Sequence, residues 1–225
     1  MTACWEKISS RLWRSMSMYK KSMEQFWSRI TVVTDRKQSI RPFLEQIEIL
    51  CREKPERIIL REKDMSPEAY EELARKVKKI CDTYRVPCFY HTYGEAAVRA
   101  GAPGLHLPLP ILRQKGGKAS YPNLILGSSV HSLEEAEEAF SLGVDYLTAG
   151  HIYATDCKKG LPPRGAAFLE EICRAVPVPV YAIGGIRLEQ GHIEKTLAAG
   201  ARGVCIMSGA MRYIPRDSGS DSFRH

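Results

Sequence analysis

Short apolar runs recur along the chain from residue 29 onward, and amphipathic segments separate them. Most of these runs, such as RIIL and PCFY, are continuously hydrophobic and lack the alternation of a half-exposed strand. Continuous runs are typical of parallel strands that are buried on both faces. The pattern predicts eight strands, over residues 29–35, 57–61, 87–91, 104–107, 124–129, 144–150, 178–184 and 203–208.

Helices are predicted between the strands, and two of them have recognisable boundary residues. Ser66 is a good N-cap, and Pro67 follows it at the first helical position. Ser132 begins another helix with Glu135 at capping-box spacing, and Gly143 ends that helix. Eight strands with interleaved helices favour a single (β/α)8 TIM barrel with a short or missing last helix. An open doubly wound sheet is the structural alternative.

Two terminal segments fall outside the barrel, which is predicted over residues 29–213. Residues 214–225 are rich in Ser, Asp, Gly and Arg and are expected to be disordered. Residues 1–28 form an N-terminal extension with apolar residues at helical spacing. A basic amphipathic helix could touch a membrane surface or a partner. The simpler interpretations, which we favour, are a helix packed on the barrel or an upstream start codon. The apolar positions are Trp5, Ile8, Leu12, Met16, Tyr19, Met23 and Phe26.

Composition narrows the range of functions. The net charge is +7, and residues 1–28 contribute five Lys/Arg against two Glu, so the barrel itself is only mildly basic. This charge suits a phosphorylated substrate but is too dispersed for nucleic acid. Seven cysteines without a CxxC motif argue against a disulfide framework or a zinc site. The chain has no apolar run long enough to span a membrane and no secretory signal, so a cytoplasmic location is expected.

The residues that could carry chemistry follow the strands, where TIM barrels place their active sites. His151 follows the sixth predicted strand, and an imidazole can both accept and release a proton near neutral pH. His91, His106 and His131 also lie near strand ends, but a structural role is more common for each alone. Two small-residue pairs end the last two strands and predict a phosphate site. These pairs are Gly184-Gly185 and Ser208-Gly209.

Arg61 and Lys63 follow the second predicted strand. Two positions apart on a strand, their side chains point the same way, so they are candidates for binding substrate anions. The alternative is that both are solvated surface charges.

Several longer motifs make the chain recognisable. GSSVHSLEEAEEA, GHIYATDCKKGLPPRG, PVYAIGGI and GVCIMSGAM together resemble the thiamine phosphate synthase superfamily, over roughly residues 29–212. The segment from His151 to Gly165 is most similar to the TenI-type branch, the thiazole tautomerases, whereas synthases usually have proline at the position of His151. Within these motifs, Ser129, His131 and Lys159 are further candidates for binding substrate.

The chain also departs from the synthase pattern. Synthases bind Mg²⁺ and pyrophosphate with an Asn-Asp pair after the third strand, where this chain has His91-Thr92. They have another aspartate after the G-x-H-L motif, where this chain reads GLHLPLPILRQ, and a glutamine where it has Ile59. Because Mg²⁺ prefers carboxylate oxygens, the metal-dependent reaction lacks evident support.

The resemblance therefore implies a thiazole tautomerase in thiamine biosynthesis, which converts a carboxylated dihydrothiazole phosphate into the aromatic carboxythiazole phosphate without a metal or redox cofactor. His151 would move the proton. The expected ligand is a small phosphorylated thiazole. The sequence does not determine the oligomeric state, and a homo-oligomer is one of the alternatives. Three alternatives remain: a thiamine phosphate synthase, a non-catalytic regulatory protein that binds thiazole or thiamine phosphate, and an unrelated phosphate-binding barrel.

Overall fold

Eight parallel strands form a closed barrel in the computed structural model, which describes residues 18, 21–155, 158 and 160–215. The strands are hydrogen-bonded in sequence order, and pairing of Val32 with Ile206 closes the ring. The TIM-barrel prediction is confirmed, and the predicted strand boundaries differ from the observed ones by at most two residues. The strands are β1 (Ile30–Val33), β2 (Arg57–Leu60), β3 (Cys88–His91), β4 (Gly104–Pro108), β5 (Ile125–Val130), β6 (Tyr146–Gly150), β7 (Val180–Ile183) and β8 (Gly203–Ile206).

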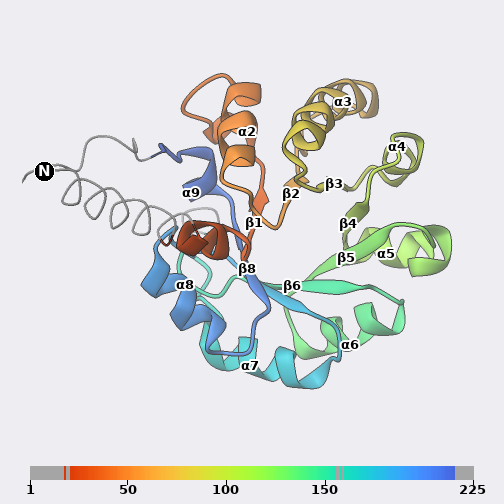
Figure 1. Ribbon diagram of the computed structural model, residues 1–225. Helices are drawn as coiled ribbons and strands as arrows, with labels where there is room; N and C mark the ends of the chain where they lie inside the picture. Colours follow the sequence, from red (N-terminus) through yellow and green to blue (C-terminus); the bar gives the residue numbers. More distant parts are fainter. Residues whose placement is uncertain (1–17, 19–20, 156–157, 159, 216–225) are drawn as a thin grey trace, which may run out of the picture.

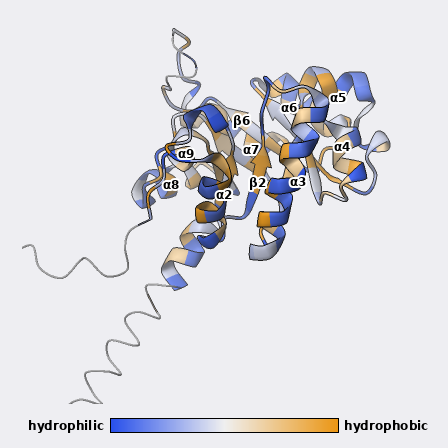
Figure 2. Cartoon of the chain, turned by 90° about the horizontal axis from the view of Figure 1, so that it is seen from above, coloured by the Kyte–Doolittle hydropathy of each residue, from blue (hydrophilic) through white to orange (hydrophobic). Residues whose placement is uncertain are grey.

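Helices surround this barrel, as Figure 1 shows, and their apolar faces cover the strands. Figure 2 shows the hydrophobic strand β2 inside and hydrophilic residues on the covering helices. The helix that follows β8 has only four residues, as the sequence predicted. The helices are α2 (Phe43–Arg52), α3 (Pro67–Tyr84), α4 (Gly94–Arg99), α5 (Leu109–Lys115), α6 (Leu133–Ser141), α7 (Gly165–Ala175), α8 (Gln190–Leu197) and α9 (Ser208–Met211), with two 3-10 turns at Arg36–Gln38 and Gly117–Ser120.

The predicted caps of α3 and α6 are present, with one difference. The Ser66 and Ser132 hydroxyls each accept a hydrogen bond from the backbone N–H three residues later, at 3.2 Å. In a capping box, the Glu135 carboxylate would return to the N–H of Ser132. It accepts instead from the N–H of His131, at 2.6 Å. This contact fixes the loop between β5 and α6 at the rim of the barrel.

A charged and aromatic cluster fills the barrel near the amino ends of its strands. The Arg57 guanidinium lies 4.8–4.9 Å from the ring centres of Phe89, Tyr146 and Tyr181. It also forms a 2.6 Å ion pair with Glu56. Such cation–π contacts are stronger when the groups are buried. Because this cluster fills one end of the barrel, the open cavity lies at the carboxyl ends of the strands.

Only part of the predicted N-terminal extension is described. Residues 21–27 are helical, and Trp27, which the sequence analysis did not single out, is 1% exposed. Its ring packs edge-on against Tyr213, with ring centres 5.0 Å apart. The segment before the barrel thus packs against the segment after α9. Most of residues 1–20 and of the predicted tail 214–225 lie outside the described residues.

Candidate functional site

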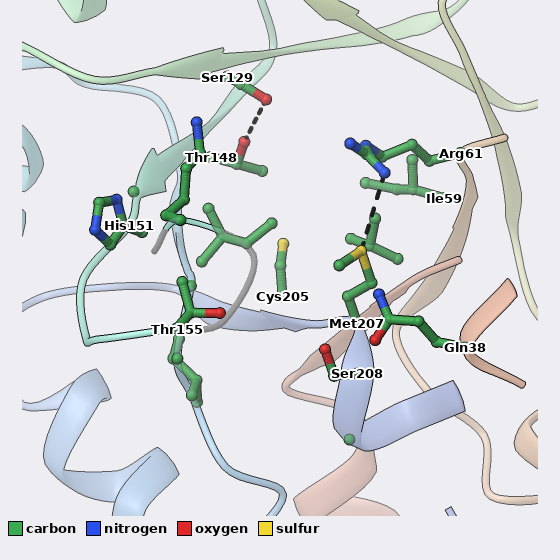
Figure 3. A pocket seen from close by; sticks show the side chains of 18 of the residues that line it. Gln38, Ile59, Arg61, Ser129, Thr148, His151, Thr155, Cys205, Met207 and Ser208 are labelled. Atoms are coloured by element: carbon green, nitrogen blue, oxygen red, sulfur yellow. Dashed lines mark hydrogen bonds between the residues drawn. The ribbon is translucent and has the colours of Figure 1, made fainter. Parts of the chain in front are cut away.

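A cavity of about 1130 Å³ opens at the carboxyl ends of the strands, where TIM barrels place their sites. Part of it is seen in Figure 3. Nine of the ten predicted site residues line it, although the strands that supply them lie far apart in the sequence. The tenth, Lys159, lies outside the described residues. The nine are Arg61, Lys63, Ser129, His131, His151, Gly184, Gly185, Ser208 and Gly209.

The two glycines after β7 have a packing role in addition to the predicted phosphate contact. Both have positive φ angles, +99° for Gly184 and +70° for Gly185. A Cβ atom on Gly184 would lie 2.3 Å from the Cβ of His151, and one on Gly185 would lie 2.4 Å from the carbonyl oxygen of Ala154. Glycine is therefore required here to let the segment after β6 pass close to β7. A substitution at Gly185 would disturb this segment as well as any bound phosphate.

The part of the predicted phosphate region next to these glycines is formed where β8 passes into α9. Ser208 and Gly209 line the cavity there, and a Cβ on Gly209 would approach side-chain carbons of Ile206 and Leu188 at 3.2 and 3.6 Å, with the backbone nitrogen of Leu188 at 3.9 Å. Arg187 and Arg212 also line this side. The sequence analysis missed both arginines, since neither lies in a recognised motif.

Three cations line another part of the cavity: Arg61, Lys63 and Lys158. The Arg61 backbone N–H donates to the hydroxyl of Thr34 at 2.9 Å, and the guanidinium lies 4.0 Å from the sulfur of Met207 (Figure 3). Burial and the charges of Arg61 and Lys158 lower the pKa of Lys63. Cations that repel one another in this way are ready to bind an anion.

His151 lies directly after β6 with 8% of its surface exposed, and it lines the cavity. In Figure 3 its ring and Arg61 lie on opposite sides of the view. The carbonyl oxygen of His151 accepts a hydrogen bond from the N–H of Arg164 at 3.0 Å, which ties the residue to the start of α7. The ring Nε2 lies 3.3 Å from the carbonyl oxygen of Leu161. Since a carbonyl can only accept, Nε2 carries the proton, and Nδ1 of the neutral ring is its basic atom.

Ser129 and His131 occupy different environments at the end of β5. The Ser129 hydroxyl accepts from Thr148 at 3.0 Å and lies 2.8 Å from Nε2 of His106, so it belongs to a buried polar chain. His131 is half-exposed at the rim, and its Nδ1 lies 3.3 Å from the Glu135 carboxylate. Ser129 therefore lies deep in the cavity, whereas His131 lies at its edge.

Two histidines within the barrel also line the cavity. His91 ends β3 and is paired with His106 in the β3–β4 register, and both are buried. The sequence analysis expected structural roles for them. One signal was available: His91 lies two positions after Phe89 and shares its face of the strand, but the direction of that face is known only from the closed barrel.

Burial has a marked effect on both rings. Burial is the largest cause that lowers the pKa of His106, to about 3, and the charges of Arg57 and Arg61 add to it. The pKa of His91 is also well below its usual value, because of burial and then the charges of His106, Arg61 and Lys63. Both imidazoles are therefore neutral at pH 7.

We predict that this neutral pair makes the protein less stable in mild acid. Below about pH 6.5, the usual histidine pKa, the unfolded chain binds protons that the folded protein does not bind. The free energy of unfolding is therefore highest above that pH. It decreases as the pH falls toward the pKa values of the two histidines in the folded protein. Between pH 7 and pH 5.5, the buried His106 alone should lower the free energy of unfolding by about 1 kcal/mol, and His91 should add to that loss. Urea denaturation at the two pH values measures this change.

His106→Gln is the control for this prediction. Between pH 7 and pH 5.5, the free energy of unfolding of this variant should fall by about 1 kcal/mol less than that of the unchanged protein, whatever its stability at pH 7. An equal loss in both proteins would contradict the assignment.

The described lining residues include no carboxylate, although they include five Lys/Arg and four histidines. Within the part of the chain that the structure describes, no group of three His, Cys, Asp or Glu residues is placed to hold a metal ion. Mg²⁺ is usually bound through one or two carboxylates together with substrate phosphates. This set of side chains does not fit the magnesium ion of a synthase, but it does fit an organic anion.

Comparisons with known proteins agree with the fold. The family model described as thiamine monophosphate synthase matches residues 30–210. Thiamine-phosphate synthase 2 of Streptococcus pneumoniae is 34% identical over 201 residues, which cover 87% of this chain and 93% of the relative. Thiamine-phosphate synthase of Pyrococcus horikoshii is 33% identical over 188 residues, with 81% and 86% covered.

A solved structure gives the same result. The thiamine phosphate pyrophosphorylase from Pyrococcus furiosus superposes with a TM-score of 0.69 at 29% identity, over 82% of this chain and 87% of that one. The names of these relatives are those of synthases, so they do not show the TenI-type branch that the sequence motifs favour. What the family match and the relatives do show is that this chain belongs to the thiamine monophosphate synthase family.

Proposed function

We propose that this protein is an enzyme that binds a small phosphorylated thiazole and catalyses a proton shift that makes the ring aromatic. The reaction is that of a thiazole tautomerase, on a carboxylated dihydrothiazole phosphate. The observation that carries this proposal is the composition of the cavity. A histidine whose Nδ1 has no partner in the described part of the chain lines the same cavity as the cations, and no carboxylate lies among the described lining residues.

The cavity offers separate places for the two anionic groups of this substrate. Gly184, Gly185, Ser208 and Gly209 would hold the phosphate, because small residues let backbone N–H groups approach an anion. Arg187 and Arg212 add positive charge on that side. The carboxylate would bind the second group of cations, to which Arg61 and Lys63 belong.

His151 would act as both base and acid. Its Nδ1 accepts the proton that leaves the ring carbon, and the electron pair of that C–H bond becomes part of the aromatic ring. The exocyclic double bond then takes up the same proton from Nδ1, so that one C–H bond is broken and one is formed. The hydrogen bond from Nε2 to Leu161 orients the imidazole throughout. A positioned acid–base group typically contributes roughly 10²–10⁴-fold in rate.

Thiamine phosphate synthase is the second candidate, and the names of the relatives favour it. That reaction joins a pyrimidine pyrophosphate to a thiazole phosphate with the help of Mg²⁺. The same phosphate site would serve the thiazole phosphate. His91 ends β3 and Thr92 follows it, where the family pattern has its Asn-Asp pair. Pro108, which follows the G-x-H-L motif, ends β4. For this reason we place the synthase second.

One experiment separates the two candidates. Purified protein in excess chelator is incubated with the dihydrothiazole phosphate, and the absorbance of the aromatic thiazole is followed. A second reaction contains Mg²⁺, pyrimidine pyrophosphate and thiazole phosphate, and thiamine phosphate is measured. We expect aromatisation in the first reaction and no coupling above background in the second. Robust coupling with Mg²⁺ would overturn the tautomerase in favour of the synthase.

A further inference from the structure

The pair formed by His91 and His106 has no role in the proposed proton transfer. Their rings are stacked with an offset, with centres 5.6 Å apart and an angle of 23° between the planes. Both residues line the cavity, on strands β3 and β4. They form an uncharged part of the lining in a cavity that is otherwise rich in cations.

His106 has no ring nitrogen left for a ligand. Its Nδ1 lies 3.0 Å from the Tyr146 hydroxyl, and its Nε2 lies 2.8 Å from the Ser129 hydroxyl. Tyr146 itself packs against Arg57, in the cluster that fills the barrel near the amino ends of its strands. The role of His106 is thus to connect the floor of the cavity to the barrel core.

His91 differs from its partner in this respect. Its Nδ1 lies 2.7 Å from the hydroxyl of Thr92, while Nε2 forms no hydrogen bond with any described part of the chain. The backbone of His91 is held in place, because its N–H donates to the Tyr70 hydroxyl at 3.0 Å. The N–H of Thr92 donates to the carbonyl oxygen of His106 at 3.0 Å. His91 therefore lines the cavity with its backbone held in place and its Nε2 without a partner in the described residues.

We propose that His91 binds the uncharged heterocycle of the substrate through Nε2, and so orients the ring between the anion sites. This inference rests on the proposed function. The groups that face His91 are His106 across the strand pair and the cations Arg61 and Lys63 after β2. These cations are suited to the phosphate and carboxylate. A neutral imidazole does not compete for either anion, and with its proton on Nε2 it can donate to the ring nitrogen of the thiazole, which has a lone pair and no hydrogen.

A matched pair of variants tests the role of Nε2. The side-chain amide of His91→Gln reaches the region of Nε2, whereas that of His91→Asn reaches only the region of Nδ1. Isothermal titration calorimetry measures the binding of aromatic thiazole phosphate and, separately, of inorganic phosphate. We expect His91→Asn to bind thiazole phosphate about tenfold more weakly, as for one lost hydrogen bond, and His91→Gln to stay within about threefold. Inorganic phosphate should bind both variants as it binds the unchanged protein.

Three results would overturn the inference. One is unchanged binding of thiazole phosphate by His91→Asn. Another is an equal loss of affinity for thiazole phosphate in both variants. The third is weaker binding of both thiazole phosphate and inorganic phosphate by the variants. That result would mean that His91 only shapes the cavity. Failure of the proposed function looks different, because the unchanged protein would then not aromatise the dihydrothiazole phosphate, whichever ligands the variants bind.

Discussion

Replacing His151 with asparagine is expected to lower turnover of the dihydrothiazole phosphate by roughly 10²-fold or more. An amide is not a base at neutral pH, so the variant has no group at the end of β6 that can accept the proton. The substrate should still bind, because the proposed phosphate and carboxylate contacts come from the ends of β2, β7 and β8. The loss should therefore appear in kcat, with little change in KM. Steady-state measurement of thiazole absorbance gives both constants.

Binding of thiazole phosphate and the melting temperature are the controls for His151→Asn. Both should remain close to those of the unchanged protein, because the residue lies at the surface of the cavity and its side chain forms one hydrogen bond with the described part of the chain. Full activity in this variant would exclude His151 as the proton carrier. Loss of both folding and binding would indicate a structural histidine that supports the segment after β6.

The second large effect is expected at Ser208, for which Asp and Asn form a matched pair. Ser208→Asp places a negative charge beside the proposed phosphate position, whereas Ser208→Asn has a similar shape and no charge. A like charge about 6–8 Å away costs about 2–3 kcal/mol at an effective dielectric constant of ~20. Ser208→Asp should therefore bind inorganic phosphate roughly 30- to 100-fold more weakly than Ser208→Asn.

Titration calorimetry at low salt measures this difference, and it should decrease as the salt concentration rises. Ser208 is a better test position than Gly185, because any side chain added at Gly185 would collide with the backbone of the segment after β6. Equal phosphate affinities in the two Ser208 variants would place the anion elsewhere in the cavity.

The sequence by itself determined the parallel α/β class, favoured the barrel over an open sheet, and predicted most of the candidate site. Continuous apolar runs predict buried parallel strands, and the capped helices between them require the parallel crossovers of an α/β fold. Residues directly after such strands must gather at one end of the barrel, which is why His151, Arg61 and Ser208 could be assigned to one site. This inference needs only chain order and the parallel direction of the strands.

Only the tertiary structure showed which side chains point inward and what each one contacts. His91 looks like any buried strand residue until the closed barrel directs it toward the cavity beside His106. Likewise, Gly184 was predicted from its motif as a phosphate contact, but the structure shows that it also lets His151 pass close to β7. The reason is that periodicity along one strand fixes which residues share a face, whereas partners, burial and charge arise from segments distant in the sequence.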